Sequence, residues 1–143
     1  LHVEPLWTER LDLIAAAGQL ASDTPVRFHD ALSAPLLLPS RPHGLRATIE
    51  AHAVRLGEPL HVLMEVDSLR LLVELLRRGI GRAFLPRRAV AEELRSGLLS
   101  AATIADHPIE RQTVLAWPAD RLTSRATQVM LRVIQDAVAA TSL

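Results

Sequence analysis

The clearest alternation of apolar and polar segments lies near the middle of the chain. An apolar strand is expected at Leu60–Val66, and the polar pair at residues 67–68 follows it. A one-sided apolar helix comes next and is predicted to stop at Gly79. A second strand is expected at Arg82–Leu85. Strand, polar turn, helix, glycine and strand in this order predict a βαβ unit.

The polar turn before this helix has two compatible interpretations. Asp67 is expected to be the N-cap, with Val66 and Leu71 in the positions of a hydrophobic staple. Ser68 can still offer its hydroxyl to a ligand, because ligands of βαβ units bind where helix starts point unpaired N–H groups. The buried stripe of the helix is expected to contain Leu69, Leu72, Val73 and Leu76.

A second strand–helix pair is expected upstream. The proline-bracketed segment Pro35–Pro39 is too short for a helix and fits a buried parallel strand. A helix is predicted at Leu45–Leu56, with Gly57 as its left-handed cap. One helical turn is expected at Phe28–Leu32, capped by Asp30 or by the residues just before it.

The remaining pattern continues the alternation, and the whole predicts an α/β architecture. The final helix needs a sheet to lie on, so it is expected to form a second, smaller lobe with the strands near both termini. The further elements are strands at Leu11–Ala17, Leu98–Ile104 and Glu110–Trp117 and helices at Arg87–Ser96, before Gly97, and at Leu122–Ala140.

Length and composition narrow the function class. The chain has 143 residues, enough for one domain or two small lobes. Sixteen basic residues balance sixteen acidic ones, which argues against a segment that grips nucleic acid. There is no cysteine, hence no disulfide and no thiolate zinc site. No apolar run reaches the ~20 residues of a membrane span and no signal peptide is visible, so a cytoplasmic protein is expected. The first residue is Leu1, so the chain is expected to be part of something longer.

The loop between the Pro35–Pro39 strand and the next helix is the main candidate for chemistry. Ser40, His43 and the N–H groups near Gly44 could hold an anion or a polar ligand, whereas the alternative is an ordinary βα turn with a capping serine. Arg46 opposes the dipole of the first helical turn and is therefore expected to meet a carboxylate of the ligand or of the protein.

The other motifs give little indication of function. Gly79-Ile80-Gly81 is not a dinucleotide fingerprint, because Phe84 replaces the third glycine and a strand follows. The six histidines show no ligand spacing, so neither a metal site nor a cofactor is expected. Arg77-Arg78 and Arg87-Arg88 are interpreted as solvated faces balanced by nearby glutamates, and no catalytic triad is apparent. The candidate glutamates are Glu74, Glu92 and Glu93.

The order of motifs resembles the effector-binding domain of LysR-type transcriptional regulators over nearly the whole chain. The motifs are EPLWTERLDLIAAAG, PLLLPSRPHGLR, EVDSLRLLVELLRRGIGRAFLPRRAV and the final strand and helix. The wording of the second motif is similar to the nitrogen-assimilation branch of that family. Arg82 departs from the small or apolar residue that is usual after the second glycine of the third motif.

The resemblance implies an α/β fold similar to type 2 periplasmic binding proteins, with two lobes joined by two crossing strands. Residues 18–112 would be a near-complete, Rossmann-like second regulatory lobe, and residues 1–17 and 113–143 would belong to the first lobe. The winged helix-turn-helix that contacts DNA in this family, and the opening half of the first lobe, have no counterpart in this chain.

The implied function is effector sensing, and no enzyme activity is expected. A small polar or anionic metabolite would bind between the lobes and change the DNA-binding geometry of a dimer or tetramer by population shift. The expected effector-binding residues are Ser40, Arg41, Pro42, His43, Gly44, Asp67, Ser68, Ile80 and Gly81.

Two alternatives share this fold. A solute-binding protein of a transport system would carry a signal peptide and a complete first lobe. A small enzyme would need a nucleophile or an acid–base pair facing the cleft, and the sequence offers none. If the residues before Leu1 are absent from the molecule, the apolar stripe of the final helix is expected to pack against a second copy.

Overall fold

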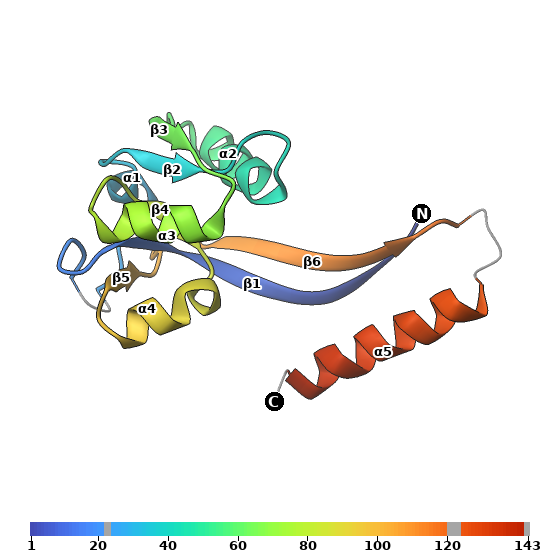
Figure 1. Cartoon of the computed structure of the whole chain (residues 1–143). Coiled ribbons are helices and arrows are strands. Elements are labelled where there is room, and N and C mark those ends of the chain that lie inside the picture. The colour runs from blue at the N-terminus through green and yellow to red at the C-terminus, as the bar shows by residue number, and fades with distance from the viewer. Residues whose placement is uncertain (22–23, 120–123, 142–143) are drawn as a thin grey trace. The chain divides into compact units, whose positions relative to one another are not determined.

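The computed structural model describes residues 1–21, 24–119 and 124–141 (Figure 1). The chain divides into two compact units, Glu9–Arg111 and Leu1–Thr8 with Gln112–Leu143. The sequence interpretation placed residues 1–17 together in the smaller unit. The observed division comes earlier because strand β1 (His2–Ala16) continues from the smaller unit into the core sheet of the larger one.

The strands of the larger unit lie in the order β3-β2-β4-β1-β5. Strand β2 (Leu36–Leu38) pairs in parallel with β3 (Val62–Glu65), and a parallel bridge between Leu36 and Arg82 joins it to β4 (Ala83–Leu85). Strand β1 pairs antiparallel with β4 and with β5 (Leu99–Ala102). The chain moves outward from β2 to β3 and then returns across β2 to β4. This reversal is a topological switch point, where ligands of open α/β sheets bind.

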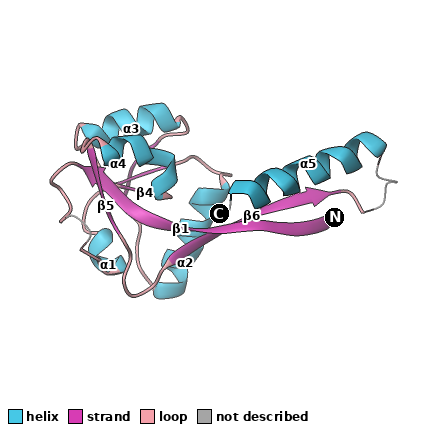
Figure 2. Cartoon of the chain, turned by 90° about the horizontal axis from the view of Figure 1, so that it is seen from below, coloured by secondary structure: helices cyan, strands magenta, loops and turns pink. Residues whose placement is uncertain are grey.

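Helices cover both faces of this sheet. Figure 2 shows α3 (Leu69–Arg77) and α4 (Ala91–Arg95) on one side of the strands and α1 (Phe28–Ala31) and α2 (Gly44–Leu56) on the other. The short 3-10 turn η1 (Arg87–Val90) leads from β4 into α4. The sealed core between these layers includes Leu13, Ile14, Leu36, Leu37, Ile49, Leu76, Phe84 and Val90, each with no exposed area.

The smaller unit contains the outer part of β1, the end of β6 (Ile109–Trp117) and α5 (Arg125–Thr141). Strand β6 pairs with β1, and the rings of His2 and Trp117 stack with centroids 5.5 Å apart. Leu122, the expected start of the final helix, lies outside the described residues. The large apolar side chains of α5 that are exposed include Val129, Met130 and Val133, at 55–58%.

The predicted α/β pattern is confirmed, but two elements differ from their predicted form. Strand β1 begins at His2 and not at Leu11, and the helix expected at Arg87–Ser96 is the 3-10 turn η1 followed by α4. Gly57, Gly79 and Gly97 follow their helices with φ near +70°, as a left-handed helix stop requires. One member of the expected buried stripe of α3 was wrong, since Leu69 is 46% exposed, whereas Leu72 and Leu76 are buried. Asp30 does not cap α1; the N-cap position is Arg27, just before the helix, and it makes no side-chain cap hydrogen bond.

Candidate functional site

Three turns lie at one edge of the parallel strands, which we call the carboxyl edge. They follow the carboxyl ends of β2, β3 and β4 and comprise residues 40–44, 67–68 and 86–88. The three strands are parallel neighbours in the order β3-β2-β4, so these turns share one end of the sheet. Helices α2 and α3 begin in the first two turns, one on each face of the sheet.

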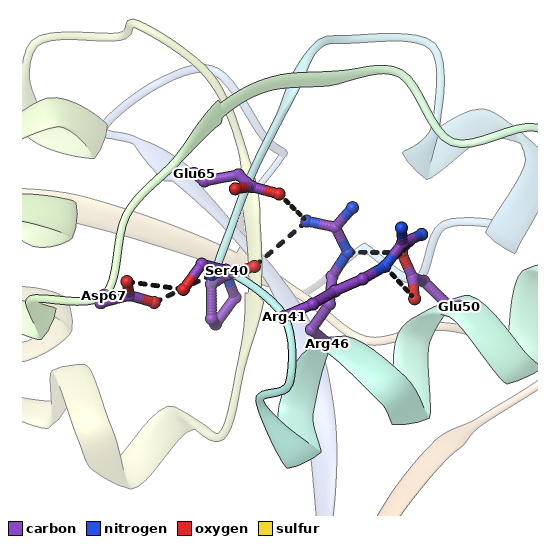
Figure 3. Close-up of polar contacts among 7 residues, drawn as sticks. Ser40, Arg41, Arg46, Glu50, Glu65 and Asp67 are labelled. Carbon is purple, nitrogen blue, oxygen red and sulfur yellow. Dashed lines mark hydrogen bonds and ion pairs between the residues drawn. The ribbon is translucent and has the colours of Figure 1, made fainter.

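A hydrogen-bonded pair ties the first two turns together. Both the backbone N–H and the hydroxyl of Ser40 donate to the carboxylate of Asp67, at 2.9 and 2.7 Å (Figure 3). These two bonds, the hydroxyl bond first, hold the pKa of Asp67 below its ordinary value. Residues that are far apart in the sequence therefore meet, and the starts of α2 and α3 are brought to one place.

The cap of α3 is Ser68, so the expectation of an Asp67 cap was wrong. The Ser68 hydroxyl oxygen accepts from the N–H of Leu71 at 3.3 Å. Asp67 is not free to cap because both of its oxygens accept from Ser40. The predicted staple of Val66 and Leu71, which depended on the Asp67 cap, fails with it.

The cap of α2 is His43, whose side chain the sequence interpretation assigned to ligand binding. Its ring Nδ1 accepts from the N–H of Leu45 at 3.1 Å. The neutral ring then carries its hydrogen on Nε2, and the residue is exposed. Just before it the Arg41–Pro42 peptide bond is cis. Gly44 begins α2, and a Cβ added there would meet no atom within 4 Å.

Arg46 meets carboxylates of the protein, one of the two outcomes foreseen for it. This residue is only 6% exposed, and its guanidinium reaches Glu50 at 2.6 Å, Glu65 at 3.2 Å and the carbonyl oxygen of Pro39 at 3.1 Å (Figure 3). Arg41 also binds Glu50, at 2.6 Å. The two arginines together lower the pKa of Glu50. The network fastens the ends of β2 and β3 to the first turns of α2.

Ile80 and Gly81 lie at the other end of these strands. A Cβ added to Gly81 would come within 3.0 Å of the Pro35 carbonyl oxygen and 3.1 Å of the Leu37 side chain. Pro35 precedes β2, whereas Ser40 follows it. The structure thus gathers the other expected site residues at the carboxyl edge and leaves Ile80 and Gly81 apart, where the glycine permits close approach of β4 to β2.

The sequence interpretation missed the third turn of the carboxyl edge. Arg87 and Arg88 were assigned to a solvated face balanced by glutamates of α4. Instead they pair with Asp12 and Glu9 of β1. The available signal was the presence of two carboxylates beside apolar residues of a core strand, because buried carboxylates need cationic partners. The interpretation of Arg77 and Arg78 was correct, since both bind Glu74.

A surface groove of about 740 Å³ runs between α3 and the η1–α4 segment. Its lining includes Leu69 and Ala89, which directly follow two of these turns, but neither Ser40 nor Asp67. Among the described residues, no three histidine or carboxylate side chains gather at metal-binding distance, and no helix is long and apolar enough to cross a bilayer.

Sequence comparison connects the chain with a family of bacterial regulators. The family model described as "LysR substrate binding domain" matches residues 1–139. The transcriptional regulator BbuR of Bordetella bronchiseptica is 33% identical over 107 residues, which is 74% of this chain and 33% of that protein. The regulator CbbR of Cereibacter sphaeroides is 36% identical over 103 residues, 71% of this chain and 33% of that protein. The chain thus matches about a third of the length of these relatives.

Solved structures share the fold. The effector-binding domain of QuiR in complex with shikimate has a TM-score of 0.82 at 17% identity, covering 97% of this chain and 66% of that one. The regulatory domain of Synechocystis CcmR in complex with 2-PG has a TM-score of 0.83 at 20% identity, with 96% and 66% covered. The predicted fold, similar to type 2 periplasmic binding proteins, is confirmed by this likeness.

The order of strands and helices, the match over residues 1–139 and the two relatives above 30% identity all point the same way. The chain belongs to the LysR substrate-binding domain family.

Proposed function

We propose that the chain is the effector-sensing domain of a LysR-type transcriptional regulator and that its carboxyl edge contributes to the effector site. The observation that carries this proposal is the double hydrogen bond from Ser40 to Asp67, which brings the starts of α2 and α3 together. The family membership and the metabolite complexes named for QuiR and CcmR support it.

The hydrogen-bonding groups at this edge favour an effector that accepts hydrogen bonds. The Ser68 hydroxyl accepts from Leu71, so its own hydrogen is available to a ligand. Neutral His43 carries its ring hydrogen on Nε2, because Nδ1 is already an acceptor. The N–H groups of the first turns of α2 and α3 add further donors. A small carboxylate or phosphate metabolite fits this set better than a cation.

The residues proposed to contact or shape the effector site all lie in the first two turns. They are Ser40, Arg41, Pro42, His43, Gly44, Asp67 and Ser68. Arg41 is engaged with Glu50 but its side chain is 71% exposed, which leaves it within reach of solvent. Ile80 and Gly81 are not part of this proposal, because they lie at the opposite end of the parallel strands.

The mechanism we propose is a population shift. An effector that binds one arrangement of the regulator more tightly changes how its DNA-binding segments are spaced in an oligomer, and a tenfold bias needs about 1.4 kcal/mol of differential affinity. DNA contact is assigned to a winged helix-turn-helix outside this chain, and the regulator is proposed to act in the cytoplasm. The near-zero formal charge agrees with a domain that does not itself grip DNA.

The two relatives above 30% identity support sensing, because BbuR and CbbR are both named as transcriptional regulators. A promoter response that depends on a small metabolite distinguishes a regulator from a solute-binding protein of the same fold.

Calorimetric titration with a panel of small carboxylates and phosphates tests the proposal. We expect Ser68→Ala and Ser40→Ala to weaken binding of the effector that the panel identifies, each by about 1 kcal/mol or more. Ser124→Ala is the matched control, because Ser124 also accepts from a first-turn N–H, that of Thr127, but at the start of α5. Unchanged affinity and unchanged promoter response in both site variants would remove these residues from the site.

A further inference from the structure

Two carboxylates are buried on β1 where the strand belongs to the larger unit. Asp12 is 6% exposed, and the side chain of Glu9 is 10% exposed. Glu9 and Asp12 are three positions apart, an odd step along the strand, so these side chains leave opposite faces of it. An ionised carboxylate taken out of water is costly unless cations compensate it. The partners of Glu9 and Asp12 therefore decide whether this part of β1 is stable.

Those partners come from η1 and β6. Arg87 donates from Nε to Asp12 and lies 3.5 Å from the Thr103 hydroxyl oxygen through Nη2. Arg88 Nη2 lies 2.6 Å from Glu9 Oε2, an ion-pair contact without hydrogen-bond geometry. Arg111 of β6 donates to the other oxygen of Glu9, with Nε at 2.9 Å. Two consecutive residues of the carboxyl edge thus hold β1 on both faces, and Glu9 links them to β6.

Solvent reaches the two sides of these pairs unequally. The side chains of Arg87 and Arg88 are 44% and 58% exposed, whereas the carboxylates they hold are almost sealed. An anion arriving from solvent can approach the guanidinium groups but not the carboxylates. Exchange of partners is therefore possible on the arginine side only.

We propose that these residues form an arginine latch, comprising Arg87 and Arg88 with Asp12, Glu9 and Arg111, which couples the carboxyl edge to β1 and β6. The inference rests on the proposed function, since it gives an anionic effector at that edge a route to the two strands shared by both units. An oxyanion that binds Arg87 or Arg88 in place of Asp12 or Glu9 removes a compensating cation from that buried carboxylate. The inner segments of β1 and β6 then open more readily.

Residue-resolved hydrogen exchange tests the latch without knowledge of the effector. In the double variant Arg87→Gln, Arg88→Gln we expect exchange at residues 9–12 and 109–111 to accelerate by about tenfold or more, while β2 and β3 change by less than about twofold. Arg95→Gln is the matched control, because Arg95 pairs with Glu92 on the exposed surface of α4. That variant is expected to leave the two segments unchanged.

An oxyanion probe separates a latch from a purely structural cross-link. In the natural chain, sodium sulfate should accelerate exchange at the two segments more than sodium chloride does at the same ionic strength, by about threefold or more. In the double variant the two salts should act alike. A uniform change across the whole unit, or equal effects of both salts on the natural chain, would overturn the proposal.

If the double variant fails to fold, Arg88→Lys replaces it. This variant keeps the charge but loses the guanidinium fork, so it should reduce the sulfate effect. This readout does not depend on effector binding, so a failed latch and a failed effector site are told apart.

Discussion

At the scale of single residues, the most informative contact is the pair of hydrogen bonds from Ser40 to Asp67. They stabilise the charged form of the carboxylate and so hold its pKa below the ordinary value of 3.8. We predict that Ser40→Ala raises the pKa of Asp67 towards that value, because the hydroxyl bond is lost while the backbone bond remains. A carbon-detected NMR titration of the carboxyl group measures the shift. An unchanged pKa in the variant would show that the contact does not exist in solution.

His52 gives a second residue-scale prediction. It is 5% exposed, its Nε2 lies 3.0 Å from the carbonyl oxygen of His107, and its Nδ1 lies 2.7 Å from the Arg55 guanidinium. Burial, and then the charge of Arg55, lower the pKa of His52 below its usual 6.5. The unfolded chain therefore binds the proton more readily, so the stability is complete above about pH 6.5 and falls as the pH drops towards the folded pKa.

Thermal unfolding measured from pH 7.5 to pH 5 tests this sign. We expect the stability of His52→Gln to fall less steeply between about pH 7.5 and pH 5, because the glutamine side chain takes up no proton on unfolding. His61→Gln, at an exposed histidine, is the control for the substitution itself. An identical slope in the His52 variant would contradict the buried neutral ring.

The residue scale is also where the sequence was least able to predict the site. Asp67 and Ser68 are both good capping residues, and nothing local decides between them. The choice depends on Ser40, which supplies two donors from another turn. Similarly, the partners of Arg87 and Arg88 lie 75 or more positions away on β1, so a nearby glutamate was the simpler expectation.

At the scale of elements, two glycines offer a matched comparison. Gly81→Ala would place a Cβ 3.0 Å from the Pro35 carbonyl oxygen, which forces β4 away from β2 and should destabilise the fold by about 1–3 kcal/mol. Gly44→Ala meets open space at the start of α2 and should change stability by no more than about 0.5 kcal/mol. Chemical denaturation measures the free energy of unfolding of both variants. Equal losses of stability would contradict the close approach at Gly81.

The Arg46 network gives an element-scale prediction about the first turns of α2. Arg46→Met removes the cation that pairs with Glu65 and one of the two arginines that pair with Glu50. This should cost about 1–3 kcal/mol after allowance for the partial exposure of both glutamates. Arg41→Met is the matched variant, because it removes a cation from the same Glu50 but at an exposed position. Its effect on the free energy of unfolding should be clearly smaller. If the two variants are equally destabilised, the buried guanidinium does not fasten the strand ends to α2.

Element types were most predictable in the middle of the chain, because α2, α3 and α4 are each followed by a glycine and strands β2 and β4 are short and apolar. The parallel character of β2 was also predicted from the uninterrupted Leu36–Leu38 segment, although its pairing with β3 was not. The side of β2 on which β4 lies was not, since it follows from the crossover through α3 and not from any local pattern. That crossover places Gly81 far from Ser40, although both belong to motifs that carried the family resemblance.

At the scale of the whole molecule, the family was recognisable from the order of motifs, whereas the boundary between units was not. Strand β1 runs through both units, so its amphipathic pattern gives no sign of where one ends. The continuity of β1 also matters for the arginine latch, because the ion pairs on Glu9 and Asp12 lie on a strand that both units share.

A crystal structure of the protein with the effector identified by calorimetric screening tests the central claim most directly. We predict acceptor atoms of the effector within hydrogen-bonding distance of the Ser68 hydroxyl and of N–H groups in the first turns of α2 and α3. An effector bound elsewhere, for example in the groove between α3 and α4, with these groups facing only water, would contradict the account.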